Sequence, residues 1–170
     1  GGATNLDLRS RNGVTTVTGA ATGLGTLTLH DNDVQSTGAM IFNGNLTANT
    51  LTTQARPYAV QLNGTTTTIT TDTTFANTGA ITLGNGGDTL SFAGGLDTTA
   101  AAGGTNVGGT VRTTNQQIDL GAVTLTANSV IDSANNTAGA TGAAINIASI
   151  TGGGATNLDL RSRNGVTTVT

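Results

Sequence analysis

The chain has 170 residues, of which 9% are charged and 2% aromatic, and its formal net charge is −3. Globular chains have roughly 25% charged residues, so an ordinary globular domain is not expected. The mild acidity argues against nucleic-acid binding, which needs a basic surface. The absence of cysteine excludes disulfides and thiolate metal sites.

Short stretches that alternate apolar and polar residues follow one another along the chain and predict strands separated by Gly- and Asn-rich turns. In chain order they lie at residues 5–10, 14–18, 24–31, 39–44, 45–53, 58–64, 65–79, 80–95, 110–114, 117–133 and 143–153. We expect two protruding loops, from Asp97 to Gly109 and from Asn135 to Gly142. No segment has a sustained apolar stripe with the 3.6-residue period of a helix, so no helix is predicted.

The first eighteen residues, Gly1 to Thr18, return letter for letter as Gly153 to Thr170, an offset of 152 residues. Such a period indicates a tandem array built by stacking. We therefore assign residues 1–152 to one full repeat and residues 153–170 to the start of the next. The chain does not begin with Met, and we interpret it as a window from a longer protein.

Two architectures use short alternating strands: an antiparallel sandwich or barrel, and a parallel β-helix whose coils bond to one another. Frequent turns, slim core residues and repeats without a linker favour a right-handed parallel β-helix. Apolar pairs recur at a spacing of about 21 residues, within the range of solenoid periods. They are Leu6 and Leu27, Val60 and Ile81, Leu62 and Leu83, and Leu90 and Val111. A coil of that length predicts about seven coils per repeat, and an advance of roughly 33 Å along the axis.

Several stretches carry a family resemblance: residues 43–53, 77–95, 110–133 and 142–153. Their strand texture and their richness in Thr, Gly and Asn resemble giant bacterial β-strand-repeat surface proteins, which include filamentous-haemagglutinin-like and autotransporter-passenger-like adhesins. The resemblance implies a right-handed parallel β-helix that is secreted or displayed at the cell surface. It implies a role as a rod, tether or fibre, or else as an adhesin that binds a glycan or a surface through protruding loops.

Two short segments contain groups that bind metals in other proteins. The segment from Gly84 to Leu90 resembles the calcium-binding nonapeptide of repeat toxins, with Asp88 as the candidate ligand. Leu83 replaces its first glycine and no neighbouring copies exist, so a Gly-rich corner is the better interpretation. His30, Asp31 and Asp33 could also bind a metal, but a solvated turn is favoured. We expect no cofactor.

An enzyme and an ice-binding protein are weaker hypotheses. β-Helical enzymes that cleave polysaccharides need carboxylates clustered with Arg or Lys in one groove, whereas the Asp residues here are scattered in sequence; Asp119, Asp132 and Arg112 are the candidates that neighbouring coils would bring together. Ice-binding faces need Thr-x-Thr at one position of every coil, and the Thr runs at 65–68 and 70–74 do not repeat in that way. We therefore predict a non-enzymatic protein.

The densest charge cluster recurs once per repeat, as Asp7, Arg9 and Arg11 and again as Asp159, Arg161 and Arg163. Arg–carboxylate pairs can join neighbouring chains, so these residues are candidate lateral contacts between fibres. The expected partners are neighbouring repeats, end to end, and other rods side by side. No apolar run is long enough for a transmembrane helix. Because an open coil has unpaired edges, we expect the 170-residue chain to associate end to end.

Overall fold

The structure is a computed structural model that describes residues 3–31, 35, 37–154 and 156–170, and the described residues form strands and turns without helices. The strands are short, as the alternating pattern predicts. They are, in chain order, β1 (Thr4–Arg9), β2 (Val14–Val17), β3 (Ala21–His30), β4 (Ala39–Phe42), β5 (Leu46–Thr53), β6 (Ala59–Leu62), β7 (Thr66–Ile69), β8 (Thr73–Thr74), β9 (Ile81–Phe92), β10 (Leu96–Asp97), β11 (Thr105–Arg112), β12 (Ile118–Leu125), β13 (Ser129–Asp132), β14 (Ile145–Gly152), β15 (Leu158–Arg161) and β16 (Thr167–Val169).

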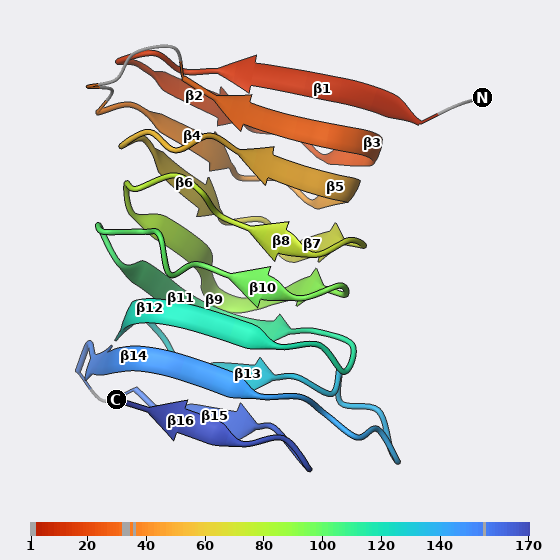
Figure 1. Cartoon of the computed structure of the whole chain (residues 1–170). Helices are drawn as coiled ribbons and strands as arrows, with labels where there is room; N and C mark the ends of the chain where they lie inside the picture. Colours follow the sequence, from red (N-terminus) through yellow and green to blue (C-terminus); the bar gives the residue numbers. More distant parts are fainter. Residues whose placement is uncertain (1–2, 32–34, 36, 155) are drawn as a thin grey trace.

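The strands wind into a coil with three sides, and each side stacks on the same side of the next turn (Figure 1). The first face holds residues 46–48, 67–69, 90–92, 110–112, 130–132 and 158–161. The second face holds residues 6–9, 27–30, 51–53, 73–74, 96–97, 118–120, 145–147 and 167–169. The third face holds residues 14–17, 39–42, 59–62, 81–83, 105–107, 123–125 and 150–152.

The pairings show that the chain is a right-handed β-solenoid of about seven turns, as predicted from the sequence. All the strand pairings of the described residues are parallel, and the antiparallel contact that joins Thr114 and Ala134 is an isolated bridge. As the chain descends from the N-terminus, β1, β3 and β5 run to the left in front while β2 and β4 run to the right behind, which is the right-handed sense (Figure 1). An antiparallel sandwich or barrel would instead need hairpins.

The four apolar pairs that share one spacing in the sequence are register partners. Leu6 pairs with Leu27, Val60 with Ile81, Leu62 with Leu83, and Leu90 with Val111. Other turns depart from this length. The turn from Thr105 to its partner Val123 is shorter, and the turn from Ser129 to its partner Leu158 is much longer. The strands therefore set the stacking, while the corners absorb the differences in length.

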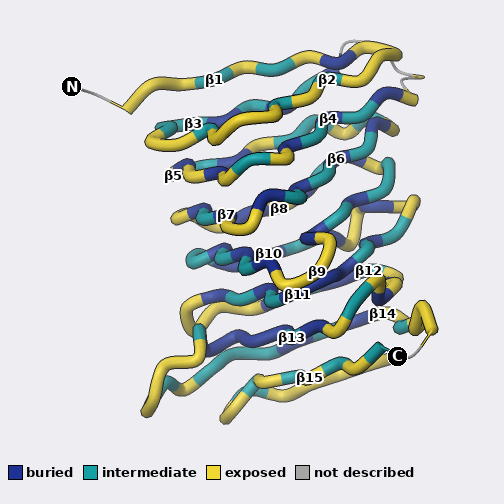
Figure 2. The backbone as a smooth tube through the Cα atoms, turned by 180° about the vertical axis from the view of Figure 1, so that it is seen from behind, coloured by how far each residue is buried: buried dark blue, intermediate teal, exposed yellow. Residues whose placement is uncertain are grey.

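Inward-facing side chains form columns along the axis and make a narrow core. Buried residues, dark blue in Figure 2, recur from turn to turn along the stack. One column on the third face contains Phe42, Leu62, Leu83, Val107 and Leu125. The large side chains of the core, which include all three Phe residues and Tyr58, are fully buried. Phe75 and Phe92 pack edge to face at 6.2 Å, a favourable geometry for two aromatic rings. Few aromatic rings are needed because the interior of the coil is narrow.

Polar groups interrupt the core near the middle of the stack. The Tyr58 hydroxyl donates to the carbonyl of Leu29 at 2.7 Å and accepts from the amide of Gln54 at 2.8 Å. Burial raises the pKa of Tyr58 to about 12, because the anion would lose its hydration. Thr67 stands in the first-face column between Leu46 and Leu90, and its buried hydroxyl has no hydrogen-bond partner. The Tyr58 hydroxyl is satisfied by hydrogen bonds to the backbone, whereas the Thr67 hydroxyl is not.

Glycines stack on one another at the corner that follows the third face. A Cβ on Gly44 would lie 2.2 Å from the carbonyl oxygen of Gly19, and a Cβ on Gly64 would lie 2.1 Å from that of Gly44. Real Cβ atoms do not approach a backbone atom this closely. The corner thus brings successive turns so close together that only glycine fits.

The loop predicted from Asp97 to Gly109 is wrong. Asp97 belongs to β10 and residues 105–109 to β11, and Thr98, Ala101 and Val107 are buried. Only the corner between the two strands is exposed, at residues 99, 100, 102 and 103. The second predicted loop is confirmed, because residues 136–139 are exposed and the segment between β13 and β14 extends beyond the coil (Figure 1). A stretch rich in Ala, Gly and Thr is compatible with a tightly packed corner as well as with an exposed loop.

Gly64→Ala should destabilise the chain by about 3 kcal/mol, because the new methyl group would overlap the Gly44 carbonyl and overpacking has costs of this order. Urea unfolding measures the change. Gly121→Ala is the matched control, since a Cβ there would meet nothing closer than 3.6 Å. Equal stability of the two variants would contradict the close stacking of the corners.

Candidate functional site

The charge cluster of the repeated segment lies on the outside of the coil in both copies. Arg9 donates to Asp7 at 3.5 Å, and Arg161 donates to Asp159 through Nε at 2.8 Å and Nη2 at 2.6 Å. About half of the Asp7, Arg9 and Asp159 side chains is exposed, and slightly less of Arg161. The hydrogen bond to Asp159 raises the pKa of Arg161. Each pair is therefore formed within one strand, and its outer surface remains accessible.

Arg11 and Arg163 complete the cluster in a turn that both copies share. Both residues have left-handed backbone conformations, with φ of 50° and 52°. The turn is closed by backbone hydrogen bonds from Gly13 to Ser10 at 3.0 Å and from Gly165 to Ser162 at 2.8 Å. Both arginine residues are exposed. The six predicted residues thus form two exposed groups, one in the first turn and one in the last.

His30 joins the first group, whereas its neighbour Asp31 does not. The Nε2 atom of His30 contacts Oδ1 of Asp7. Loss of water acts to raise the pKa of Asp7, but the hydrogen bonds from His30 and Arg9 outweigh it, so this pKa lies below its ordinary value. Asp31 is buried, and its carboxylate accepts from the Ser10 hydroxyl at 3.0 Å. Asp33 lies outside the described residues, and His30 and Asp31 do not converge on one point.

Asp88 forms a hydrogen bond within the corner in which it lies. Its buried carboxylate accepts a hydrogen bond from the amide of Asn85 at 2.7 Å, within the turn made by Gly84, Gly86 and Gly87 at positive φ. Among the described residues, no group of three His, Asp, Glu or Cys side chains is arranged to hold a metal ion. The geometry supports a carboxylate that closes a Gly-rich corner.

Of the three residues proposed to meet across coils, only Arg112 and Asp132 are neighbours. They are register partners on the first face, and Asp132 is in turn the partner of Arg161. The buried Asp132 carboxylate accepts from the amides of Ala134 and Asn136, at 2.8 and 2.7 Å. Asp119 lies on the second face instead, so the predicted grouping is wrong for this residue.

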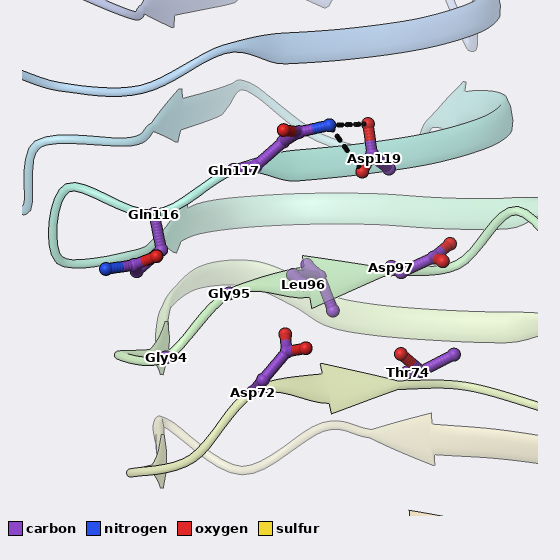
Figure 3. Close-up of a pocket in the computed structure, with 9 residues that line it drawn as sticks. All are labelled: Asp72, Thr74, Gly94, Gly95, Leu96, Asp97, Gln116, Gln117 and Asp119. Carbon is purple, nitrogen blue, oxygen red and sulfur yellow. Dashed lines mark hydrogen bonds between the residues drawn. The ribbon is translucent and has the colours of Figure 1, made fainter.

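The second face carries a group of carboxylates that the sequence analysis missed (Figure 3). Asp72, Asp97 and Asp119 line a hollow of about 260 Å³. Asp97 and Asp119 are register partners. The carboxylate of Asp97 accepts from Thr99, and that of Asp119 accepts from Gln117 and Asn146. In the sequence, the three carboxylates follow one another at intervals close to one turn of the coil. This spacing could have predicted that they lie on adjacent turns.

This hollow lacks part of what a polysaccharide-cleaving site needs. None of the residues that line it is Arg or Lys, and such sites combine carboxylates with basic groups that hold the substrate. Gln117 and Asn146 both donate to Asp119, at 2.8–2.9 Å. The arrangement is that of a polar outer ladder, in which side-chain amides donate hydrogen bonds to a carboxylate on the same or the adjacent strand.

Other outward polar residues form ladders of the same kind. Asn63 donates to Asn43 at 3.2 Å, and Thr52 donates to Thr28 at 3.3 Å. The Thr run that suggested an ice-binding face alternates, because Thr67 and Thr73 are buried while Thr66 and Thr74 are exposed. On the outward side, the residues that follow Thr68 in the next two turns are Ser91 and Arg112, so Thr-x-Thr does not recur at this position of every coil.

Comparison with known proteins adds no family. No protein-family model matches the chain, and the searches of curated proteins and solved structures return no match. Within the described part of the chain, no helix is long and apolar enough to cross a membrane.

The double variant Asp159→Asn, Arg161→Gln should change the free energy of unfolding by less than about 0.5 kcal/mol, because exposed ion pairs contribute little. If the pair is a lateral contact, the variant should also associate less between chains at low salt. Urea unfolding and light scattering measure the two effects. Asp7→Asn, Arg9→Gln is the comparison, since Asp7 also contacts His30. Unchanged association in both variants would contradict the lateral contact.

Proposed function

We propose that this chain is a structural repeat segment of an exported surface or fibre protein, and that it acts as a rod, tether or filament. The observation that carries the proposal is the junction between the repeats. The opening of the second repeat stacks directly on the first, with β15 on β13 and β16 on β14. The coil thus continues from one repeat into the next, and further repeats would lengthen it.

The outer surface of the coil supports a mechanical role. Its side chains include ladders of Thr and Asn, and few of them are charged. Among the described residues, the metal candidate Asp88 closes a corner and the catalytic candidate Asp119 belongs to a ladder. The turn-to-turn hydrogen bonds run along the axis, which suits a protein that spans a distance. We infer an extracellular location, at the bacterial surface or in secreted fibres, on the resemblance to filamentous-haemagglutinin-like and autotransporter-passenger-like proteins.

The end turns support end-to-end contact. Leu6, Leu8, Leu158 and Leu160 face the core but are only partly buried, and Val169 is 49% exposed. A neighbouring turn would cover this apolar surface and pair the free strand edges. Neighbouring repeats are therefore the partners that the ends fit best.

A chain of three tandem repeats should form a straight rod about 100 Å long, because each turn advances by about 4.8 Å. Electron microscopy measures the length, and the 170-residue chain is the short reference. A compact particle would overturn the proposal. Concentration-dependent sedimentation of the 170-residue chain checks end-to-end contact, and a strict monomer at high concentration would contradict it.

The exposed loop at residues 135–142 favours a second candidate, an adhesin that binds a glycan or a surface. Removal of residues 136–141 should abolish adhesion if this loop is the contact, while the rod remains intact in micrographs. A variant with Gly or Ser at the same positions is the control for loop length. Adhesion that survives the deletion would reject this second function.

A further inference from the structure

The repeated segment occupies different faces of the coil in its two copies. Residues 6–9 of β1 lie on the second face, where they pair with residues 27–30 of β3. The identical residues 158–161 lie on the first face, where they pair with residues 129–132 of β13. In the same way, residues 14–17 lie on the third face and residues 167–169 on the second. Each strand of the second copy is one face behind its counterpart in the first.

The local structure of the segment is nevertheless preserved. Leu6 and Leu8 face the core, as do Leu158 and Leu160. Asp7 and Asp159 pair with the Arg two residues later, and both copies make the same turn at left-handed Arg. The segment has therefore not unfolded or reversed its sides in the second copy. It has moved around the axis as a unit.

The turns between the two copies account for this shift. Between β1 and β15, the chain returns to the second face six times, at residues 27–30, 51–53, 73–74, 96–97, 118–120 and 145–147. It then passes the third face at residues 150–152 and reaches the first face at β15. One repeat thus contains six complete turns and two of the three sides of a seventh.

Chain length explains why the seventh turn is not completed. For Asp159 to lie on the second face, as Asp7 does, it would have to pair with Asn146. The shortest turn between described strands runs from Thr105 to Val123, and the chain from Asn146 to Asp159 is shorter still. Asp159 instead pairs with Val130, and the long span between these two residues includes the exposed loop at 135–142. The junction between the two repeats is therefore too short to place the second copy on the same face as the first.

We propose that successive repeats of the rod are rotated by one third of a turn, so that the loop at residues 135–142 faces a different direction in each repeat. This inference rests on the proposed tandem rod. Loops of neighbouring repeats are then about 32 Å apart along the axis, and loops that share a direction recur about every 96 Å. The exposed Asp159–Arg161 pair then also faces a different direction in each repeat.

Disulfide trapping in the 170-residue chain tests the rotation, because the chain has no cysteine of its own. Val130→Cys with Asp159→Cys should form a disulfide on oxidation, since adjacent parallel strands lie within disulfide reach. Asn146→Cys with Asp159→Cys should not. Mass spectrometry after digestion identifies the bond. The reference pair is Asp7→Cys with Thr28→Cys, which are register partners in the first copy.

Each result has one meaning. A disulfide between positions 146 and 159 would overturn the rotation, and so would the absence of one between positions 130 and 159 when the reference pair is oxidised. Failure of the reference pair as well would instead refute the parallel stacking, and with it the proposed rod. In a three-repeat chain with gold bound at Thr137→Cys, electron cryo-microscopy should show labels in three directions. Labels in one line on an intact rod reject the rotation alone, whereas a compact particle rejects the rod.

Discussion

The hydrogen bonds between successive turns are the constraint on which the rest of this molecule depends. Each strand must return to within about 4.8 Å of its counterpart one turn earlier, whatever the chain does between them. Inward positions then fall into columns such as Phe42, Leu62 and Leu83, and outward positions into ladders such as Asn43 and Asn63. At the corners the same spacing leaves room only for backbone, which is why Gly19, Gly44 and Gly64 lie one above another.

This constraint explains what the sequence could predict. Partners such as Val60 and Ile81 have the same role in consecutive turns, so apolar pairs recurred at one constant spacing and revealed the stacking. The alternation of Leu and polar residues also fixed which side of each strand faces the core. The alternation lies within one strand and the spacing joins consecutive turns, so both can be seen in the sequence without knowledge of how the corners are built.

The corners, by contrast, were poorly predicted because they vary in length. The short turn that ends at Val123 and the long turn that ends at Leu158 both bring their strands into parallel register, so no single period locates every partner. The segment from Asp97 to Gly109 was misread for a related reason. Its small residues, Ala101 among them, are buried in a tight corner, and composition does not separate such a corner from an exposed loop. The neighbourhood of Asp97 and Asp119 was missed because Asp97 was assigned to this loop and not to a side of the coil.

The two copies of the repeated segment show which features depend on its own sequence and which depend on its place in the chain. Its strands, its ion pair and its turn at Arg11 or Arg163 are the same in both copies, so these features come from the eighteen residues themselves. Its face on the coil differs, and so do the partners, since Ser10 donates to Asp31 whereas Ser162 donates to the carbonyl of Gly165. The face is set by the number of coil sides that precede the segment. The number of sides in a repeat therefore acts on the assembled rod independently of its strand sequences. The corners absorb small differences in length, whereas addition or loss of one whole side would change the direction of every later side chain without changing the fold of any turn.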